Sequence, residues 1–149
     1  MDKKGAYLST IETEHAKIRE IIRELNGLLE GKNDVAFLHR PLVELSVLLP
    51  RHVDGEDAVF YRELRSEAVI KGQAALLPAL DVYMSSMHEL TRRVEEFFQR
   101  YLGDSIKVEK DREESFVREL SALLDDVIKR MDSEEGSLFH IYRAYFPKD

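Results

Sequence analysis

The fold is decided by the stretch Leu45-Ser-Val-Leu-Leu-Pro-Arg-His52-Val-Asp-Gly-Glu56-Asp-Ala-Val59. Written as a helix, it belongs to a stripe whose members recur every three or four residues: Leu38, Leu42, Leu45, Leu49, His52, Glu56 and Val59. This spacing places them all on one helical face. The stripe is apolar until His52 and Glu56, which occupy positions where core residues are expected. Burying an imidazole and a carboxylate is costly unless other groups pair with them, so the rest of the chain should supply partners.

The composition is typical of a single helical domain. The chain has 149 residues, of which 44% are hydrophobic and 34% are charged, with seven glycines and four prolines. It has no cysteine, which excludes disulfides, thiolate metal sites and a cysteine nucleophile. A net charge of −7 argues against nucleic acid or an anionic membrane as the main partner. Without a signal peptide or a membrane-spanning run, we expect a cytoplasmic monomer or homodimer.

Four amphipathic stretches predict four helices. The first begins at Ser9 and ends before Asp34, and the others cover about 34–67, 73–102 and 106–139. The second contains Pro41 and Pro50, and we expect one kinked helix because its seam stays in phase through both; a short helix ending before Pro41 is the alternative. An aromatic tail, 140–149, is expected to fold back. The sequence thus predicts an all-α, up-down-up-down four-helix bundle in one domain, 1–149, with a core of about 8–139.

Every predicted helix carries a polar or ionisable residue on its inner stripe. These residues are His15 in the first helix, His52 and Glu56 in the second, His88 in the third, and Arg130 and Glu134 in the fourth. Antiparallel packing brings them to roughly the same level, at about 1.5 Å of rise per residue. Three imidazoles and two carboxylates in a bundle core suit a borderline divalent cation such as iron, zinc or manganese, and a glutamate can bridge two ions.

The ordered set His15, His52-x-x-x-Glu56, His88 and Glu134 resembles the hemerythrin-like (HHE cation-binding) family. The local stretches that carry the resemblance are Glu14-His15-Ala-Lys-Ile-Arg19, His52-Val-Asp-Gly-Glu56-Asp57 and Ser133-Glu134-Glu135-Gly-Ser-Leu-Phe139. The resemblance covers residues from about 8 to 139. It implies a four-helix bundle with a non-haem di-iron centre, in which the three histidines are ligands and the two glutamates are bridging carboxylates. We expect neither haem nor an iron–sulfur cluster.

Two positions depart from the family pattern. Arg130 stands where the family carries a histidine four residues before its glutamate. Met84 stands where the oxygen-carrying members have a further histidine. A guanidinium does not ligate metal and repels a nearby cation. We therefore expect a modified site with at most one strong metal position, and an oxygen carrier is the least favoured function.

The resemblance implies a metal-binding domain that acts in sensing, storage or regulation linked to iron, oxygen or nitric oxide. No catalytic residue is identified, and turnover by a non-haem iron enzyme stays open, with binding favoured. The alternative is a metal-free helical bundle that acts as a protein-interaction or regulatory module. In that case Arg130 would pair with Glu134 on its own helix and with Glu56 across the bundle, and one protonated histidine would balance the second carboxylate.

Overall fold

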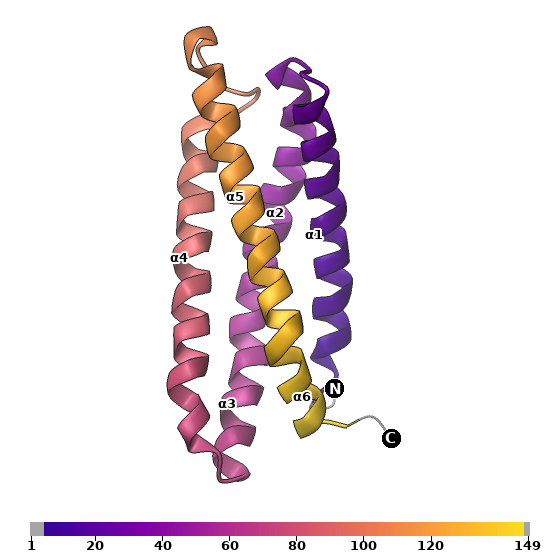
Figure 1. Ribbon diagram of the computed structural model, residues 1–149, viewed down its shortest axis with the longest axis vertical. Coiled ribbons are helices and arrows are strands. Elements are labelled where there is room, and N and C mark those ends of the chain that lie inside the picture. Colours follow the sequence, from indigo (N-terminus) through magenta and orange to yellow (C-terminus); the bar gives the residue numbers. More distant parts are fainter. Residues whose placement is uncertain (1–4, 148–149) are drawn as a thin grey trace.

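The computed structural model describes residues 5–147 and shows four long antiparallel rods (Figure 1). The rods are built from α1 (Tyr7–Glu30), the 3-10 turn η1 (Val35–Leu38), α2 (His39–Gly55), the π-helical turn η2 (Glu56–Phe60), α3 (Tyr61–Ile70), the 3-10 turn η3 (Ala74–Leu76), α4 (Leu77–Tyr101), the 3-10 turn η4 (Lys110–Arg112), α5 (Glu113–Ser133), the π-helical turn η5 (Glu134–Leu138) and α6 (Phe139–Tyr145). The described residues contain no strand. The predicted all-α, up-down-up-down bundle is confirmed.

The second rod runs without a break through both prolines. Helix α2 continues through η2 into α3, as the in-phase seam predicted. Pro41 lies in the first turn of α2, where backbone N–H groups have no partner within the helix. Pro50 lies inside α2, and the helix continues beyond it. The short helix that would end before Pro41 is present only as the 3-10 turn η1, which leads directly into α2.

Three element ends differ from the sequence-based expectation. Helix α1 begins at Tyr7 instead of Ser9, whose hydroxyl donates to the carbonyl of Ala6 and does not cap the helix. Helix α5 begins at Glu113, because the chain after α4 forms a loop closed by a Leu102–Ile106 bridge. The aromatic tail continues the fourth rod as α6 and does not fold back.

Two apolar clusters fill the bundle, one above and one below a buried polar layer. The upper cluster gathers side chains such as Ile18, Leu45, Phe97 and Leu120 from α1, α2, α4 and α5. The lower cluster gathers aromatic and aliphatic side chains from α1, η2, α3, α4, η5 and α6: Leu8, Ile11, Phe60, Tyr61, Leu64, Ala68, Leu80, Leu138, Phe139, Tyr142 and Tyr145. Between them lie four buried polar side chains, His15, His52, Glu56 and Glu134. The polar residues therefore form a layer that divides the core.

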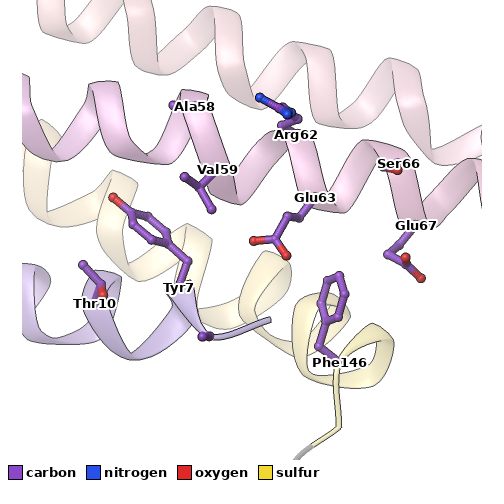
Figure 2. A pocket seen from close by; sticks show the side chains of 10 residues that line it. Tyr7, Thr10, Ala58, Val59, Arg62, Glu63, Ser66, Glu67 and Phe146 are labelled. Atoms are coloured by element: carbon purple, nitrogen blue, oxygen red, sulfur yellow. The ribbon is translucent and has the colours of Figure 1, made fainter. Parts of the chain in front are cut away.

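A pocket of about 550 Å³ opens at the lower end of the bundle (Figure 2). It lies between the beginning of α1, the turn η2, α3 and the aromatic ring of Phe146. No helix in the described part of the chain is long and apolar enough to cross a lipid bilayer.

Candidate metal centre

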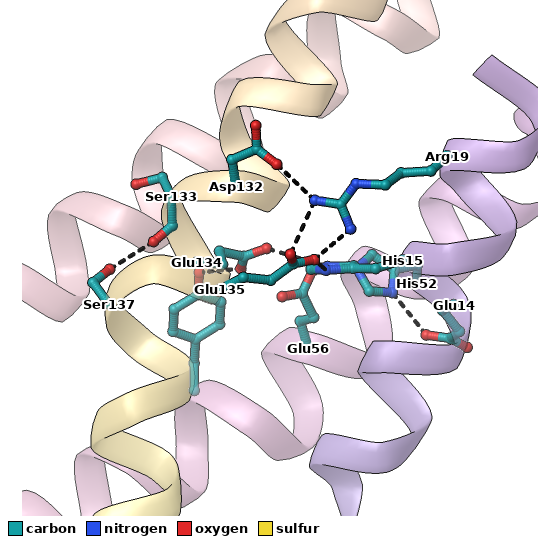
Figure 3. A network of polar contacts seen from close by, with 11 residues as sticks. Glu14, His15, Arg19, His52, Glu56, Asp132, Ser133, Glu134, Glu135 and Ser137 are labelled. Atoms are coloured by element: carbon teal, nitrogen blue, oxygen red, sulfur yellow. Dashed lines mark hydrogen bonds and ion pairs between the residues drawn. The ribbon is translucent and has the colours of Figure 1, made fainter. Parts of the chain in front are cut away.

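Four of the sequence-predicted residues meet in the polar layer (Figure 3). His15 comes from α1, His52 from α2, Glu56 from η2 and Glu134 from η5. One potential ligand atom from each of them lies within 4.8 Å of those of the others. Each residue exposes 1% or less of its surface, so the cluster is closed to bulk water.

Both glutamates are the first residue of a π-helical turn. The backbone N–H of Tyr61 donates to the carbonyl of Glu56, and that of Phe139 donates to the carbonyl of Glu134, so each bond spans five residues. A π turn inserts one extra residue into a helix and is frequently found at functional sites. The next inward residues are consequently Phe60 and Leu138. The sequence analysis had placed Val59 on the inner stripe, and the inserted residue explains this difference.

Outer carboxylates orient both imidazoles. Nδ1 of His15 lies 2.7 Å from Oε2 of Glu135, and Nδ1 of His52 lies 2.7 Å from Oε1 of Glu14. An ionised carboxylate can only accept, so each Nδ1 carries a hydrogen and donates it. The lone pair of each ring is then on Nε2, which faces the cluster. Histidines that ligate metal are held by this same arrangement.

Arg19 holds Glu135, the carboxylate that accepts from His15, in place (Figure 3). Its guanidinium donates to both oxygens of Glu135, at 2.6 and 3.0 Å, and to Oδ1 of Asp132 at 2.7 Å. Burial raises the pKa of Glu135, but hydrogen bonds from Arg19 and His15 outweigh burial and hold that pKa below its ordinary value. Glu135 is therefore ionised at neutral pH and can accept from His15.

The inner atoms of the cluster lack hydrogen-bond partners among residues 5–147. They are His15 Nε2, His52 Nε2, both carboxylate oxygens of Glu56, and Glu134 Oε1. Nε2 of His52 lies 2.7 Å from Oε1 of Glu56, and Nε2 of His15 lies 3.5 Å from Oε1 of Glu134. With both imidazoles neutral and both carboxylates ionised, each of these contacts would bring two lone-pair atoms together. Buried polar atoms are normally paired, and five converging nitrogen and oxygen atoms form a donor set that suits a borderline divalent cation.

The two carboxylates differ in their preference for a proton. Burial, followed by the neighbouring Glu134, raises the pKa of Glu56 well above its ordinary value. Burial also raises the pKa of Glu134, but the neighbouring His15, Glu56 and Tyr61 side chains outweigh it, and the pKa is lowered. Without a cation, the pair is therefore best described as a protonated Glu56 beside an ionised Glu134.

Tyr61 turns its hydroxyl into the polar layer. This hydroxyl donates to Oε2 of Glu134 at 2.8 Å, and the side chain is fully buried. Burial and the charge of Glu134 raise the pKa of Tyr61 far above its ordinary value. From the sequence, Tyr61 could flank a metal centre, but a helical tyrosine usually packs with its hydroxyl outward. Its position five residues after Glu56 is a signal only when the π turn is known.

His88 lies outside the cluster. Its side chain is 53% exposed on α4, and its Nε2 is 2.6 Å from Oδ2 of Asp57. Met87, one position earlier, carries the buried side chain at this level of α4. At this level the inner face of α4 is therefore rotated by about 100° from the stripe predicted from the sequence.

Arg130 does not form either of the ion pairs expected for a metal-free core. Its Nη2 donates to the hydroxyl of Ser86, and its guanidinium carbon lies 5.3 Å from the centroid of the Tyr83 ring. None of the ion pairs between described residues joins it to Glu56 or Glu134. The cation on this helix is thus directed toward α4 and pairs with neither buried carboxylate, whose nearest basic groups are the imidazoles of His15 and His52.

The pocket of Figure 2 reaches the turn that carries Glu56. Ala58 and Tyr7 contribute to its wall. A Cβ added to Gly55 would lie 1.9 Å from the Tyr7 hydroxyl oxygen, so glycine is needed at that position for the ring to fit. Burial, followed by the charges of Glu14 and Glu56, raises the pKa of Tyr7. The Tyr7 ring therefore lines this pocket and lies beside the residue that precedes Glu56.

A comparison with protein families agrees with this geometry. The family model described as Hemerythrin HHE cation binding domain matches residues 7–142, which include all four clustered residues and both π turns. No match was found among curated proteins or among solved structures. Since the matched region spans nearly the whole chain, the protein belongs to the hemerythrin HHE cation-binding domain family.

Proposed function

We propose that the protein binds one non-haem iron ion in the buried cluster and acts in sensing, storage or regulation linked to iron, oxygen or nitric oxide. The observation that carries the proposal is the convergence of five buried, unpaired ligand atoms from three rods. His15 and His52 would supply Nε2, and Glu56 and Glu134 would supply carboxylate oxygens. Bound iron would supply Lewis acidity and, in its ferrous state, affinity for a diatomic gas.

We infer a single metal position because two of the expected ligand positions are not available to the cluster. His88, which the resemblance assigns as a ligand, is paired with Asp57 at the surface. Arg130 occupies the position of the other expected histidine and contacts Ser86. A second ion would therefore have only shared carboxylates as ligands, and we infer a mononuclear site.

The charge of the cluster supports a cation over a metal-free core. An unsatisfied buried polar atom costs about 1–3 kcal/mol, and more when charged. The metal-free alternative needed Arg130 together with a protonated histidine to balance the two carboxylates, and this guanidinium is directed elsewhere. A divalent ion would neutralise Glu56 and Glu134 and satisfy both imidazoles in one step.

The burial of the site favours sensing or storage over turnover of a large substrate. Four protein ligands leave room in the coordination sphere of iron for a further small ligand. All four ligand residues expose 1% or less, so only a molecule the size of a gas or water would fit there. Tyr61 would act at this position by holding Glu134 in place through its 2.8 Å hydrogen bond.

The test is metal content and metal titration of the full chain. We expect about one equivalent of iron per chain after purification without chelator, and one equivalent on titration with ferrous iron under anaerobic conditions. His52→Ala should abolish tight binding, whereas His88→Gln and His39→Gln should bind as the wild type does, because these histidines lie outside the cluster. Two tight equivalents would contradict the mononuclear site, and no uptake at all would contradict metal binding.

A further inference from the structure

A polar groove of about 400 Å³ runs between α4 and α5, separate from the metal cluster. Ser86 and Glu89 of α4 line one side, and Lys129, Arg130 and Ser133 of α5 line the other. The metal proposal gives none of these residues a role. Arg130 is the residue of the sequence analysis whose presence in the seam is still unexplained.

The guanidinium of Arg130 has hydrogen-bond donors that no other described residue uses. It is the only half-buried arginine that forms no ion pair within the described part of the chain. A guanidinium has five N–H donors, and the one hydrogen bond that Arg130 makes to another described residue goes to the Ser86 hydroxyl. The Tyr83 ring covers one face of the guanidinium. The side chain is thus held in place with most of its donors free, which is costly unless an anion or water accepts from them.

The charges around the groove leave a small positive excess. Arg93 lies 3.0 Å from Asp126, so these two residues neutralise each other. Two cations, Lys129 and Arg130, then remain in the groove. They are opposed by one carboxylate, Glu89, which has no ion pair among residues 5–147. This excess is notable in a chain of net charge −7, which repels anions from most of its surface.

Hydroxyl groups complete the donor set. Ser86 and Ser133 stand on opposite sides of the groove, one on α4 and one on α5. The hydroxyl of Tyr83 lies 3.0 Å from that of Ser133 and 2.8 Å from that of Ser137, which fixes this side. A planar guanidinium fork beside serine hydroxyls and an ammonium group is a donor set that matches the oxygens of phosphate or sulfate.

We propose that the groove between α4 and α5 binds a small tetrahedral oxyanion, phosphate or sulfate, through Arg130, Lys129 and the hydroxyls of Ser86 and Ser133. The site is independent of the metal cluster, because none of the four metal ligands lines it. Arg130 is then a ligand-binding residue, held ready by Tyr83 and Ser86.

The experiment is calorimetric titration of the metal-free full chain with inorganic phosphate at constant ionic strength. We expect saturable 1:1 binding with a dissociation constant of about 1 mM or tighter. Arg130→Gln should weaken it by about tenfold or more. Arg51→Gln should bind as the wild type does, because Arg51 is exposed on α2, outside the groove. Equal binding by Arg130→Gln and the wild type, or no saturable binding, would overturn the proposal.

A second variant tests the charge argument in the opposite direction. Glu89→Gln removes the unpaired carboxylate and should tighten phosphate binding by about twofold to fivefold. Unchanged or weaker binding would contradict the placement of the anion beside Glu89. Acetate, which is planar, should bind at least about tenfold more weakly than phosphate, and equal affinity would overturn the tetrahedral class. Thermal unfolding of each variant confirms that it is folded.

Discussion

Removing the carboxylate of Glu14 should weaken metal binding although no metal-contacting atom is changed. Oε1 of Glu14 accepts from Nδ1 of His52 at 2.7 Å and thereby keeps Nε2 of the ring directed at the cluster. In Glu14→Ala the ring loses this acceptor and can rotate or change tautomer. Loss of such an outer partner typically costs 10- to 100-fold in metal affinity, which corresponds to about 1.4–2.8 kcal/mol.

The assay is calorimetric titration with ferrous iron under anaerobic conditions, followed by thermal unfolding with and without the metal. A change of 1 kcal/mol shifts the midpoint of a domain of about this size by roughly 2–4 °C. The stabilisation that metal gives to Glu14→Ala should accordingly be smaller than in the wild type by about 3–11 °C. Glu14→Gln should lie between the two, because its amide oxygen can still accept from His52.

Glu12→Ala is the matched control. Glu12 lies on the same helix, is exposed, and is 3.5 Å from Arg143 at the surface, away from the imidazoles. It should bind metal as the wild type does. Wild-type affinity in Glu14→Ala would refute the argument that the outer carboxylate orients His52. An equal loss in Glu12→Ala would show that the effect is only the general loss of negative charge.

Two further predictions concern stability and are read by urea unfolding of the metal-free protein. Gly55→Ala should destabilise it by about 1–3 kcal/mol, because the new methyl would lie 1.9 Å from the Tyr7 hydroxyl. Gly27→Ala, inside α1 with nothing within 4 Å, should instead stabilise it by about 0.5–1 kcal/mol. Tyr61→Phe should cost about 1–3 kcal/mol, because Oε2 of Glu134 loses its buried donor; an unchanged midpoint would show that another group satisfies this oxygen.

The helices and their directions could be predicted from the sequence because their seams are regular. The apolar residues of each seam follow one another at intervals of three or four positions. Members of these seams such as Ile11, Ile18 and Leu120 are buried in the structure. The ends of helices were less predictable. They depend on contacts between backbone groups, such as the bridge between Leu102 and Ile106, that leave no periodic pattern.

The candidate site, too, could be predicted only where its residues lie on regular seams. His15, His52 and Glu134 lie on regular seams, and the structure brings them together with Glu56. The seam of α4 is irregular, so a reading one residue out of phase placed His88 inside the bundle. The outer carboxylates had no periodic signal at all, because the contact of Glu14 with His52 joins residues 38 positions apart on different helices.

The two π turns leave a trace in the sequence, in the spacing of the buried residues that follow each glutamate. Before Glu56 the inward-facing residues are spaced alternately by three and four positions. After it the next inward-facing residue is Phe60, one position later than this spacing predicts. The same one-residue shift follows Glu134, where Leu138 faces inward. A π turn is rare, so its occurrence in two different rods at the level of the buried carboxylates links it to the cluster. It lets each glutamate face the polar layer while the apolar side chains beneath still close the lower core.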